Sequence, residues 1–384
     1  MRRGIRMLVS AVLTGAAAAT VAFSAGAADA EPEIPATPEG LANYMNSLLN
    51  PAADGRTPEF IVDSGSSSGS GSGSATPRSF ATDTRGNGPE MSSFLAAFAH
   101  GLSNPDAAPP GTNDWNCRPS AEHPRPVVLV HGTWLNAYDT YAYMAPQLVR
   151  AGFCVFTTNF GRLGVLDGGG VGPILPGRYG VGPMEDSAKQ LGVLVDRVLA
   201  TTGADKVDVI GHSQGGPVTS HYMKFEGGHD KVGKLITFGA TNHGTSLLGM
   251  ATLGRIITNL GVNILGFYQP IIGAANIQQA VGSHFYAVLN ADGDTVPGVS
   301  YTSVGTRHDQ ISNPYEWTFL QAGPDATVEN ITLQQGCEQD FSDHLTLMYS
   351  PRAISIALRA LDPVAHPELV CSFNPWMIGG GGKL

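Results

Sequence analysis

Apolar residues follow two different spacings along the chain from residue 124 onward. Short runs rich in β-branched residues, typical of buried strands, are followed by stretches in which apolar side chains recur every three to four residues. Leu191, Leu194, Val195 and Val198, for example, would share one face of a helix. Such alternation of strands and helices predicts a mostly parallel central sheet with helices on both faces.

The pattern predicts six strands and five helices. The strands are expected at residues 126–130, 154–159, 206–210, 235–239, 299–304 and 328–333. The helices are expected at residues 91–102, 144–151, 184–201, 215–225 and 344–361. One domain, residues 89–384, would hold all of these elements, because α/β folds often exceed about 250 residues as a single unit.

The chain before residue 89 has a different composition. Residues 31–88 lack the alternating pattern, and residues 64–74 consist only of serine and glycine. Tracts of this kind are flexible linkers. We therefore expect residues 31–88 to form a low-complexity linker region before the domain.

The first thirty residues have the features of a secretory signal. Three arginines precede an apolar run over residues 7–25, and Ala28-Asp29-Ala30 has the small-x-small pattern of a signal-peptidase site. A membrane anchor is the alternative, because the run is close to the shortest length that spans a bilayer. No later stretch is apolar for long enough to span one. We expect cleavage near Ala30 and a secreted protein.

Charge argues against a nucleic-acid ligand. The formal net charge is −10, and the residues after the expected signal hold 19 basic and 31 acidic side chains, with no Lys/Arg cluster. Phosphate backbones and anionic membrane surfaces would repel such a chain. A neutral substrate fits better, and a hydrophobic content of 42% is enough for a sizeable core.

Four cysteines, Cys117, Cys154, Cys337 and Cys371, form an even set in a chain expected to be secreted. This suggests two disulfides, for which three pairings are open. Pairing of sequence neighbours would close loops of under forty residues, each worth roughly 4 kcal/mol in chain entropy. A metal site is not expected, because the sequence has no Cys-x-x-Cys motif or Cys/His cluster.

The strongest chemical signal is Gly211-His212-Ser213-Gln214-Gly215. This motif lies directly between a predicted strand and a predicted helix, which is the context of a nucleophile elbow. The glycines relieve crowding, so the serine can adopt a strained backbone and present its hydroxyl from the turn. We predict Ser213 as a nucleophile; the alternative is a tight structural turn.

A serine nucleophile needs a base, and the base needs an orienting acid. In the α/β-hydrolase fold, which the elbow indicates, these residues follow in the order serine, acid, histidine. We predict His344 as the base, because it follows the last strand in a loop that can reach the nucleophile. His243 is the alternative, since it closely follows a strand end. His221 lies within the helix after the elbow and would point away.

Asp309 is predicted as the acid. It follows its strand at the carboxyl end, where ligands bind in open α/β sheets. Asp292 and Asp294 precede that strand and are interpreted as turn residues. Asp340 and Asp343 come too late in the chain.

The first predicted strand ends in His131-Gly132-Thr133-Trp134. A loop at this place supplies one donor of the oxyanion hole in this fold, so we expect the N–H groups of Thr133 and Gln214 to bind the tetrahedral oxyanion. Each such donor is typically worth about 3–4 kcal/mol. The Thr133 hydroxyl offers a third hydrogen bond, or else caps a turn, and His131 is interpreted as a brace for the loop.

Together these motifs resemble the secreted triacylglycerol lipases of actinobacteria and, more distantly, yeast lipase B. The similarity covers about residues 115–375. It rests on residues 127–133, Gly211-His212-Ser213-Gln214-Gly215, Asp309-Gln310-Ile311 and Asp343-His344. The resemblance implies the disulfides Cys117–Cys154 and Cys337–Cys371. Yeast lipase B has Thr-Trp-Ser-Gln-Gly at the elbow, so fine specificity does not transfer.

Two segments are expected to shape the substrate site. Residues 161–183 are rich in glycine and long for a loop. Residues 247–281 are mostly apolar with helical spacing and follow a predicted strand, so they would lie over the sheet as an acyl-binding wall or lid. Plain core packing is the alternative for this second segment.

The sequence therefore predicts a secreted triacylglycerol lipase or carboxylesterase with the triad Ser213, Asp309 and His344. Its partner would be a neutral lipid or other ester at an oil–water interface, without nucleic acid, a stable membrane span, a metal or another cofactor. Alternatives on the same fold are a polyester hydrolase, an acyltransferase and a peptidase. A non-catalytic binding protein would normally lack part of the triad.

Overall fold

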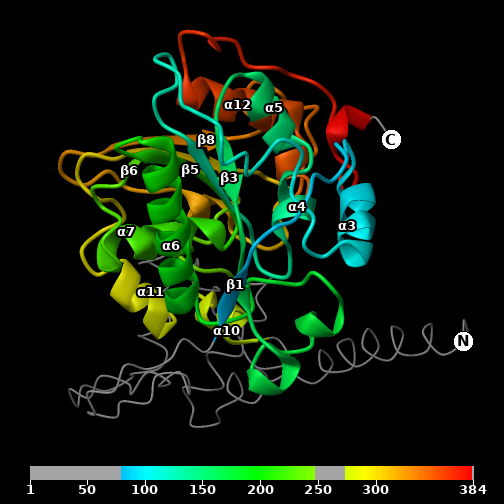
Figure 1. Ribbon diagram of the computed structural model, residues 1–384, viewed down its shortest axis with the longest axis vertical. Helices are drawn as coiled ribbons and strands as arrows, with labels where there is room; N and C mark the ends of the chain where they lie inside the picture. Colours follow the sequence, from blue (N-terminus) through cyan, green and yellow to red (C-terminus); the bar gives the residue numbers. More distant parts are fainter. Residues whose placement is uncertain (1–78, 247–272, 383–384) are drawn as a thin grey trace, which may run out of the picture. The chain divides into compact units, whose positions relative to one another are not determined.

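A six-stranded parallel sheet is the centre of the computed structural model, which describes residues 79–246 and 273–382 (Figure 1). The strands lie in the order β3-β2-β5-β6-β7-β8, and every neighbouring pair is parallel. Their bounds are β2 Val127–Val130, β3 Val155–Thr157, β5 Val207–His212, β6 Val232–Phe238, β7 Ser300–Gly305 and β8 Thr327–Thr332. The predicted fold class and the six predicted strands are confirmed.

One face of the sheet is covered by α6 (Met184–Thr202), α7 (Gly215–Phe225) and α11 (His284–Leu289). Their buried side chains pack with Val128 and Val130 of β2. The helices predicted here, α6 and α7, are confirmed. The short α11 was not predicted.

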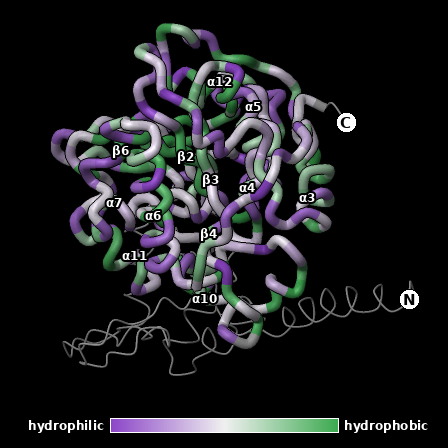
Figure 2. The backbone as a smooth tube through the Cα atoms, viewed as in Figure 1, coloured by the Kyte–Doolittle hydropathy of each residue, from purple (hydrophilic) through white to green (hydrophobic). Residues whose placement is uncertain are grey.

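The opposite face is covered by α4 (Ala137–Tyr141), α5 (Met144–Arg150) and α12 (Pro351–Leu361). These helices pack with Val127 and Leu129 of β2. Successive strand residues point to opposite faces, and both faces are covered by helices, so all four residues of β2 are buried. Figure 2 shows β2 as an apolar run.

Two more helices complete the described part of the chain. The helix predicted at residues 91–102 is present as α3 (Phe94–Ser103), which packs beside α4. The short α10 (Ala274–Gln278) lies just before α11. Like α4, it has too few turns to produce a periodic apolar pattern.

The C-terminal helix begins later than predicted. The expected start was residue 344, but α12 begins at Pro351, and a 3₁₀ turn at Leu347–Tyr349 precedes it. Proline is favoured in a first helical turn, where its missing N–H costs nothing. The hydroxyl of Ser350 accepts the N–H of Ala353 and caps the helix. Residue 344 therefore belongs to a loop.

The last residues of the predicted linker region, 79–88, are described by the structure. Residues Phe80–Thr82 form β1, which pairs antiparallel with β4 (Asn159–Arg162) in a separate two-stranded sheet. A three-residue strand has no periodicity that marks it in the sequence. The expected signal segment and the Ser/Gly tract, residues 64–74, lie outside the described residues.

Two disulfides are formed, between Cys117 and Cys154 and between Cys337 and Cys371. The pairing that the resemblance implied is confirmed. Cys154 immediately precedes β3, an edge strand of the sheet, and is joined to the loop before β2. Within residues 79–246 and 273–382, no helix combines the length and apolar character needed to cross a bilayer.

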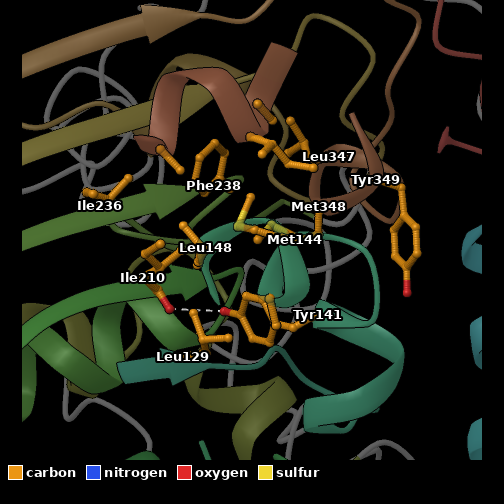
Figure 3. Packing of buried hydrophobic residues seen from close by; sticks show 14 of the residues in the cluster. Leu129, Tyr141, Met144, Leu148, Ile210, Ile236, Phe238, Leu347, Met348 and Tyr349 are labelled. Atoms are coloured by element: carbon orange, nitrogen blue, oxygen red, sulfur yellow. Dashed lines mark hydrogen bonds between the residues drawn. The ribbon is translucent and has the colours of Figure 1, made fainter. Parts of the chain in front are cut away.

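Tyr141 joins the neighbouring strands β2 and β5 near the ends that carry the predicted site. Its ring is fully buried among the apolar side chains between α5, α12 and the sheet (Figure 3). Its hydroxyl donates to the carbonyl oxygens of Val130, at 2.7 Å, and Ile210, at 3.0 Å. The residues after these two strands are consequently held together.

We predict that Tyr141→Phe lowers the free energy of unfolding by about 1–3 kcal/mol, because two buried carbonyl groups lose a donor. Urea unfolding with the disulfides intact measures this change. Tyr315→Phe is the matched control, because the Tyr315 hydroxyl only approaches Thr332 at 3.5 Å, and its effect should stay within about 0.5 kcal/mol. Equal losses in the two variants would contradict the role of Tyr141.

Candidate active site

Ser213 occupies the turn between β5 and α7 in a strained backbone conformation. Its φ is +54°, which is rare for a residue other than glycine. The turn packs tightly, because a Cβ atom placed on Gly215 would lie 2.2 Å from the carbonyl oxygen of Val130. The N–H of Ser213 donates to the carbonyl of Phe238 at 3.0 Å. The local geometry is thus that of the predicted elbow.

Asp309 and His344 form a buried pair. The Nδ1 atom of His344 lies 3.0 Å from each carboxylate oxygen of Asp309, and both side chains are almost wholly excluded from solvent. Oδ1 of Asp309 also accepts the backbone N–H groups of Ile311, at 2.8 Å, and Ser312, at 2.7 Å. These donors fix the position of the carboxylate beside the imidazole.

The elbow and this pair meet at the carboxyl ends of β5, β6 and β7. A Cβ atom placed on Gly239 would lie 3.1 Å from Oδ2 of Asp309 and 3.2 Å from Nδ1 of His344. The carbonyl oxygen of the preceding residue, Phe238, accepts the N–H of Ser213. In addition, Nε2 of His212, next to the serine, donates to the backbone carbonyl of His344 at 2.8 Å.

No hydrogen bond joins the Ser213 hydroxyl to the His344 ring among the described contacts. Catalytic hydrogen bonds of this type are often long before the substrate binds and tighten in the Michaelis complex. With Nδ1 bound to Asp309, the second ring nitrogen of His344 is the one available as a proton acceptor.

The loop after β2 lies directly against the serine. A Cβ atom placed on Gly132 would come within 2.9 Å of Cβ of Ser213. Among the described residues, the N–H groups of Thr133 and Gln214 have no hydrogen-bond acceptor. Gln214 also precedes the first turn of α7, whose N-terminus favours negative charge. Two unoccupied donors beside a serine hydroxyl suit a developing oxyanion.

Two buried histidines brace the site without carrying charge. Burial lowers the pKa of His131 and of His212 to about 3. Nε2 of His131 accepts the N–H of Phe160 at 3.2 Å, so its Nδ1 carries the proton and donates to the carbonyl of Gly132 at 2.8 Å. His131 therefore ties the loop after β2 to Phe160 of β4.

Arg178 clamps the same loop from the glycine-rich segment. Its Nη1 donates to the carbonyl of Trp134 at 2.9 Å, and its Nη2 lies 2.7 Å from the buried carboxylate of Asp139. Burial raises the pKa of Asp139 to about 6, an effect that the nearby Arg178 guanidinium opposes. Trp134 itself has a φ of +57°. The strained loop is thus held by a buried ion pair.

The alternatives to Asp309 and His344 lie in other surroundings. Nε2 of His243 donates to Asp294 at 3.0 Å, and its Nδ1 donates to the carbonyl of Trp317. His221 stacks on Phe285 within the core of the sheet's α7 face. Asp343 accepts the N–H and hydroxyl of Thr346, and Asp340 accepts the hydroxyls of Ser342 and Ser350. Asp292 is exposed.

The two segments expected to shape the site differ in what the structure describes. Residues 247–272, most of the proposed acyl-binding wall, lie outside the described residues. The glycine-rich segment contacts the loop after β2, since a Cβ atom placed on Gly172 would lie 2.6 Å from the Trp134 indole nitrogen. Beside it, Val171, Ile174 and Leu175 are exposed.

Several residues of the site were not predicted from the sequence. His212 and Gln310 contact His344, and Arg178 and Gln279 contact the loop after β2. His212 and Gln310 had a local signal, because they adjoin Ser213 and Asp309 in the motifs that carry the resemblance. Arg178 and Gln279 are remote from these motifs in sequence and had none. Within the described residues, no three His, Cys, Asp or Glu side chains are grouped closely enough to hold a metal ion.

The match to a known protein family agrees with this architecture. The model of the family described as alpha/beta hydrolase fold matches residues 125–352. The crystal structure of Aspergillus fumigatus lipase B is 18% identical with a TM-score of 0.48; the match covers 68% of this chain and 56% of that one. Lipase BlEst2 of Bacillus licheniformis in its mature form is 16% identical with a TM-score of 0.44, covering 64% and 94%. The chain thus spans little more than half of the Aspergillus protein.

The neutral histidines predict a loss of stability in acid. An unfolded histidine takes up a proton below about pH 6.5, whereas His131 and His212 stay neutral in the folded chain until about pH 3. Their stabilising contribution is present above pH 6.5 and is lost as the pH falls toward 3. Between these pH values, each histidine lowers the free energy of unfolding by about 1.4 kcal/mol for every unit by which the pH falls.

Urea unfolding between pH 7 and 4 tests this prediction with His212→Asn. The free energy of unfolding of the variant should fall less steeply than that of the wild type, by about 1.4 kcal/mol per pH unit. The exposed His229 supplies the matched control, His229→Asn. The prediction fails if His212→Asn and the wild type have the same slope.

Proposed function

The chain belongs to the alpha/beta hydrolase fold family, and from this premise we propose that it is a serine ester hydrolase. Ser213 attacks the ester carbonyl while His344 accepts the hydroxyl proton, and His344 then donates that proton to the leaving alcohol. The resulting acyl-enzyme is hydrolysed by water, which His344 activates in the same way. Asp309 stays ionised, orients the imidazole and stabilises its cation.

The observation that carries the proposal is the buried Asp309–His344 pair beside a strained serine. Nδ1 of His344 is bound by both carboxylate oxygens at 3.0 Å, which selects the tautomer whose Nε2 accepts a proton. The free N–H groups of Thr133 and Gln214 form the oxyanion hole of the proposed mechanism. All steps use side chains and backbone groups of the chain itself.

We propose neutral lipid esters, including triacylglycerols, as the substrate class. An acidic chain disfavours anionic esters. The exposed apolar side chains of Val171, Ile174 and Leu175 lie beside the loop that carries Thr133, where they would contact acyl chains at an oil–water interface. The resemblance to secreted triacylglycerol lipases supports the same choice.

Secretion is part of the proposal. The N-terminal residues have the pattern of a cleaved signal ending near Ala30. Two disulfides suit an oxidising compartment. Mass determination of the protein recovered from the culture medium of its source would test the cleavage position directly.

We predict that Ser213→Ala abolishes hydrolysis of p-nitrophenyl esters from C2 to C16 and of emulsified triolein. Removal of a triad serine costs on the order of a million-fold in kcat. Ser300→Ala, at an exposed position that begins β7, is the matched control and should keep full activity. Circular dichroism verifies that both variants are folded.

The substrate panel separates the remaining activities. Hydrolysis of triolein and long-chain esters by the wild type identifies a lipase, and cleavage of short esters alone identifies a carboxylesterase. Folded wild-type protein that cleaves no ester at all would overturn the proposed function.

We predict that Asp309→Asn lowers kcat by about 10⁴-fold, because an amide no longer holds the reactive tautomer or stabilises the imidazolium. Asp292→Asn changes the same groups at an exposed position and should have no effect. Steady-state kinetics on p-nitrophenyl butyrate measure both. Similar activity of the two variants would remove Asp309 from the triad.

A further inference from the structure

The hydroxyl of Thr133 has a buried partner outside the predicted site. Nε2 of Gln279 donates to Oγ1 of Thr133 at 2.7 Å, across 146 positions of sequence. Gln279 directly follows α10 and is 4% exposed. Placing a long, polar side chain in the interior is costly unless its groups are paired, so its contacts define what it does there.

The orientation of the Gln279 amide is set by its other neighbours. Nε2 lies 3.2 Å from the carbonyl of Ala275, which can only accept. Oε1 accepts the hydroxyl of Thr241 at 3.0 Å, and Thr241 in turn accepts the phenol of Tyr286 at 3.0 Å. Hydrogen bonds therefore run in one direction, from Tyr286 through Thr241 and Gln279 to Thr133.

This direction determines the hydrogen position on Thr133. A hydroxyl has one donor and can accept at its lone pairs. Because Gln279 already donates to the Thr133 oxygen, the Thr133 hydrogen is turned away from Gln279 and can be donated elsewhere. The backbone N–H of the same residue belongs to the proposed oxyanion hole, so the charge to which we assign this hydrogen is the same oxyanion.

We propose that Gln279 is a positioning residue that orients the Thr133 hydroxyl as a third donor to the oxyanion. The inference rests on the proposed ester hydrolysis and adds a residue to it. Tyr286 is the first donor in this series of hydrogen bonds. Tyr286 and Thr241 are both buried, so water does not compete for their hydrogen bonds. A donor oriented before the reaction stabilises the transition state without reorganisation.

The test is Gln279→Glu, which reverses the direction of one hydrogen bond. A neutral carboxyl group at this position can donate to Thr133 as the amide does. The ionised carboxylate can only accept, so it captures the Thr133 hydrogen and removes the third donor. We expect the kcat of the variant, relative to the wild type at each pH, to fall by about 10²-fold as the introduced carboxyl ionises, with KM nearly unchanged.

A double-mutant cycle with Thr133→Val separates positioning from general damage. In the Thr133→Val background the relative kcat of Gln279→Glu should be independent of pH, because no hydroxyl remains to be turned. Thr133→Val alone should lower kcat by about 10²-fold, whereas Thr133→Ser should retain most activity. Gln321→Glu, at an exposed glutamine, is the matched control for the added charge.

The outcomes are distinct. A pH-dependent loss in Gln279→Glu that vanishes with Thr133→Val supports the inference. A loss of equal size in both backgrounds, or full activity of Thr133→Val, overturns it. If Gln279→Glu does not fold, the Thr133→Val and Thr133→Ser pair still decides whether a third donor exists. A wild type without esterase activity refutes the proposed function, which is a separate result.

Discussion

The close contact between the serine turn and the end of β2 is the constraint on which the site depends. Gly215 approaches the carbonyl of Val130 so closely that no side chain fits between them. The same contact brings the loop after β2 against Ser213, and Tyr141 holds the two strand ends from the other side. The proposed nucleophile and the proposed oxyanion donors are therefore positioned by the same packing contact, and a displacement of either strand end would move both.

Around this contact the polar groups are buried, directional and mostly neutral. His131 and His212 each use one ring N–H to hold a backbone carbonyl, and burial keeps them uncharged. The charged exceptions are Arg178 and Asp139, which face one another, and the Asp309 carboxylate of the proposed triad. In a site built from neutral donors, the charges that develop during the proposed reaction are those of the His344 imidazolium and the oxyanion. The low dielectric constant of the buried site strengthens the attraction between these two charges.

Much of the fold and the central candidates were accessible from the sequence, because they depend on local patterns. Strand β2 and helix α7 follow from apolar runs and spacing, and the motif around Ser213 specifies its own turn. The predicted start of α12 was wrong because apolar spacing continues through residues 344–350. These residues include a buried 3₁₀ turn, and the helix begins only where Ser350 caps it and Pro351 opens it. Gln279 was not predictable, since its proposed role depends on a contact with Thr133 that folding creates.

The complete burial of β2 has a consequence for how this chain tolerates change. Its four residues are Val-Val-Leu-Val and are buried on both faces, so a shift by one position would exchange one apolar side chain for another and expose nothing polar. The strand itself carries little information about its own register. The register is fixed instead by Gly215 and by the hydroxyl of Tyr141, which both contact Val130 at the end of the strand. Apolar substitutions inside β2 should therefore be tolerated much better than substitutions of Gly215 or Tyr141.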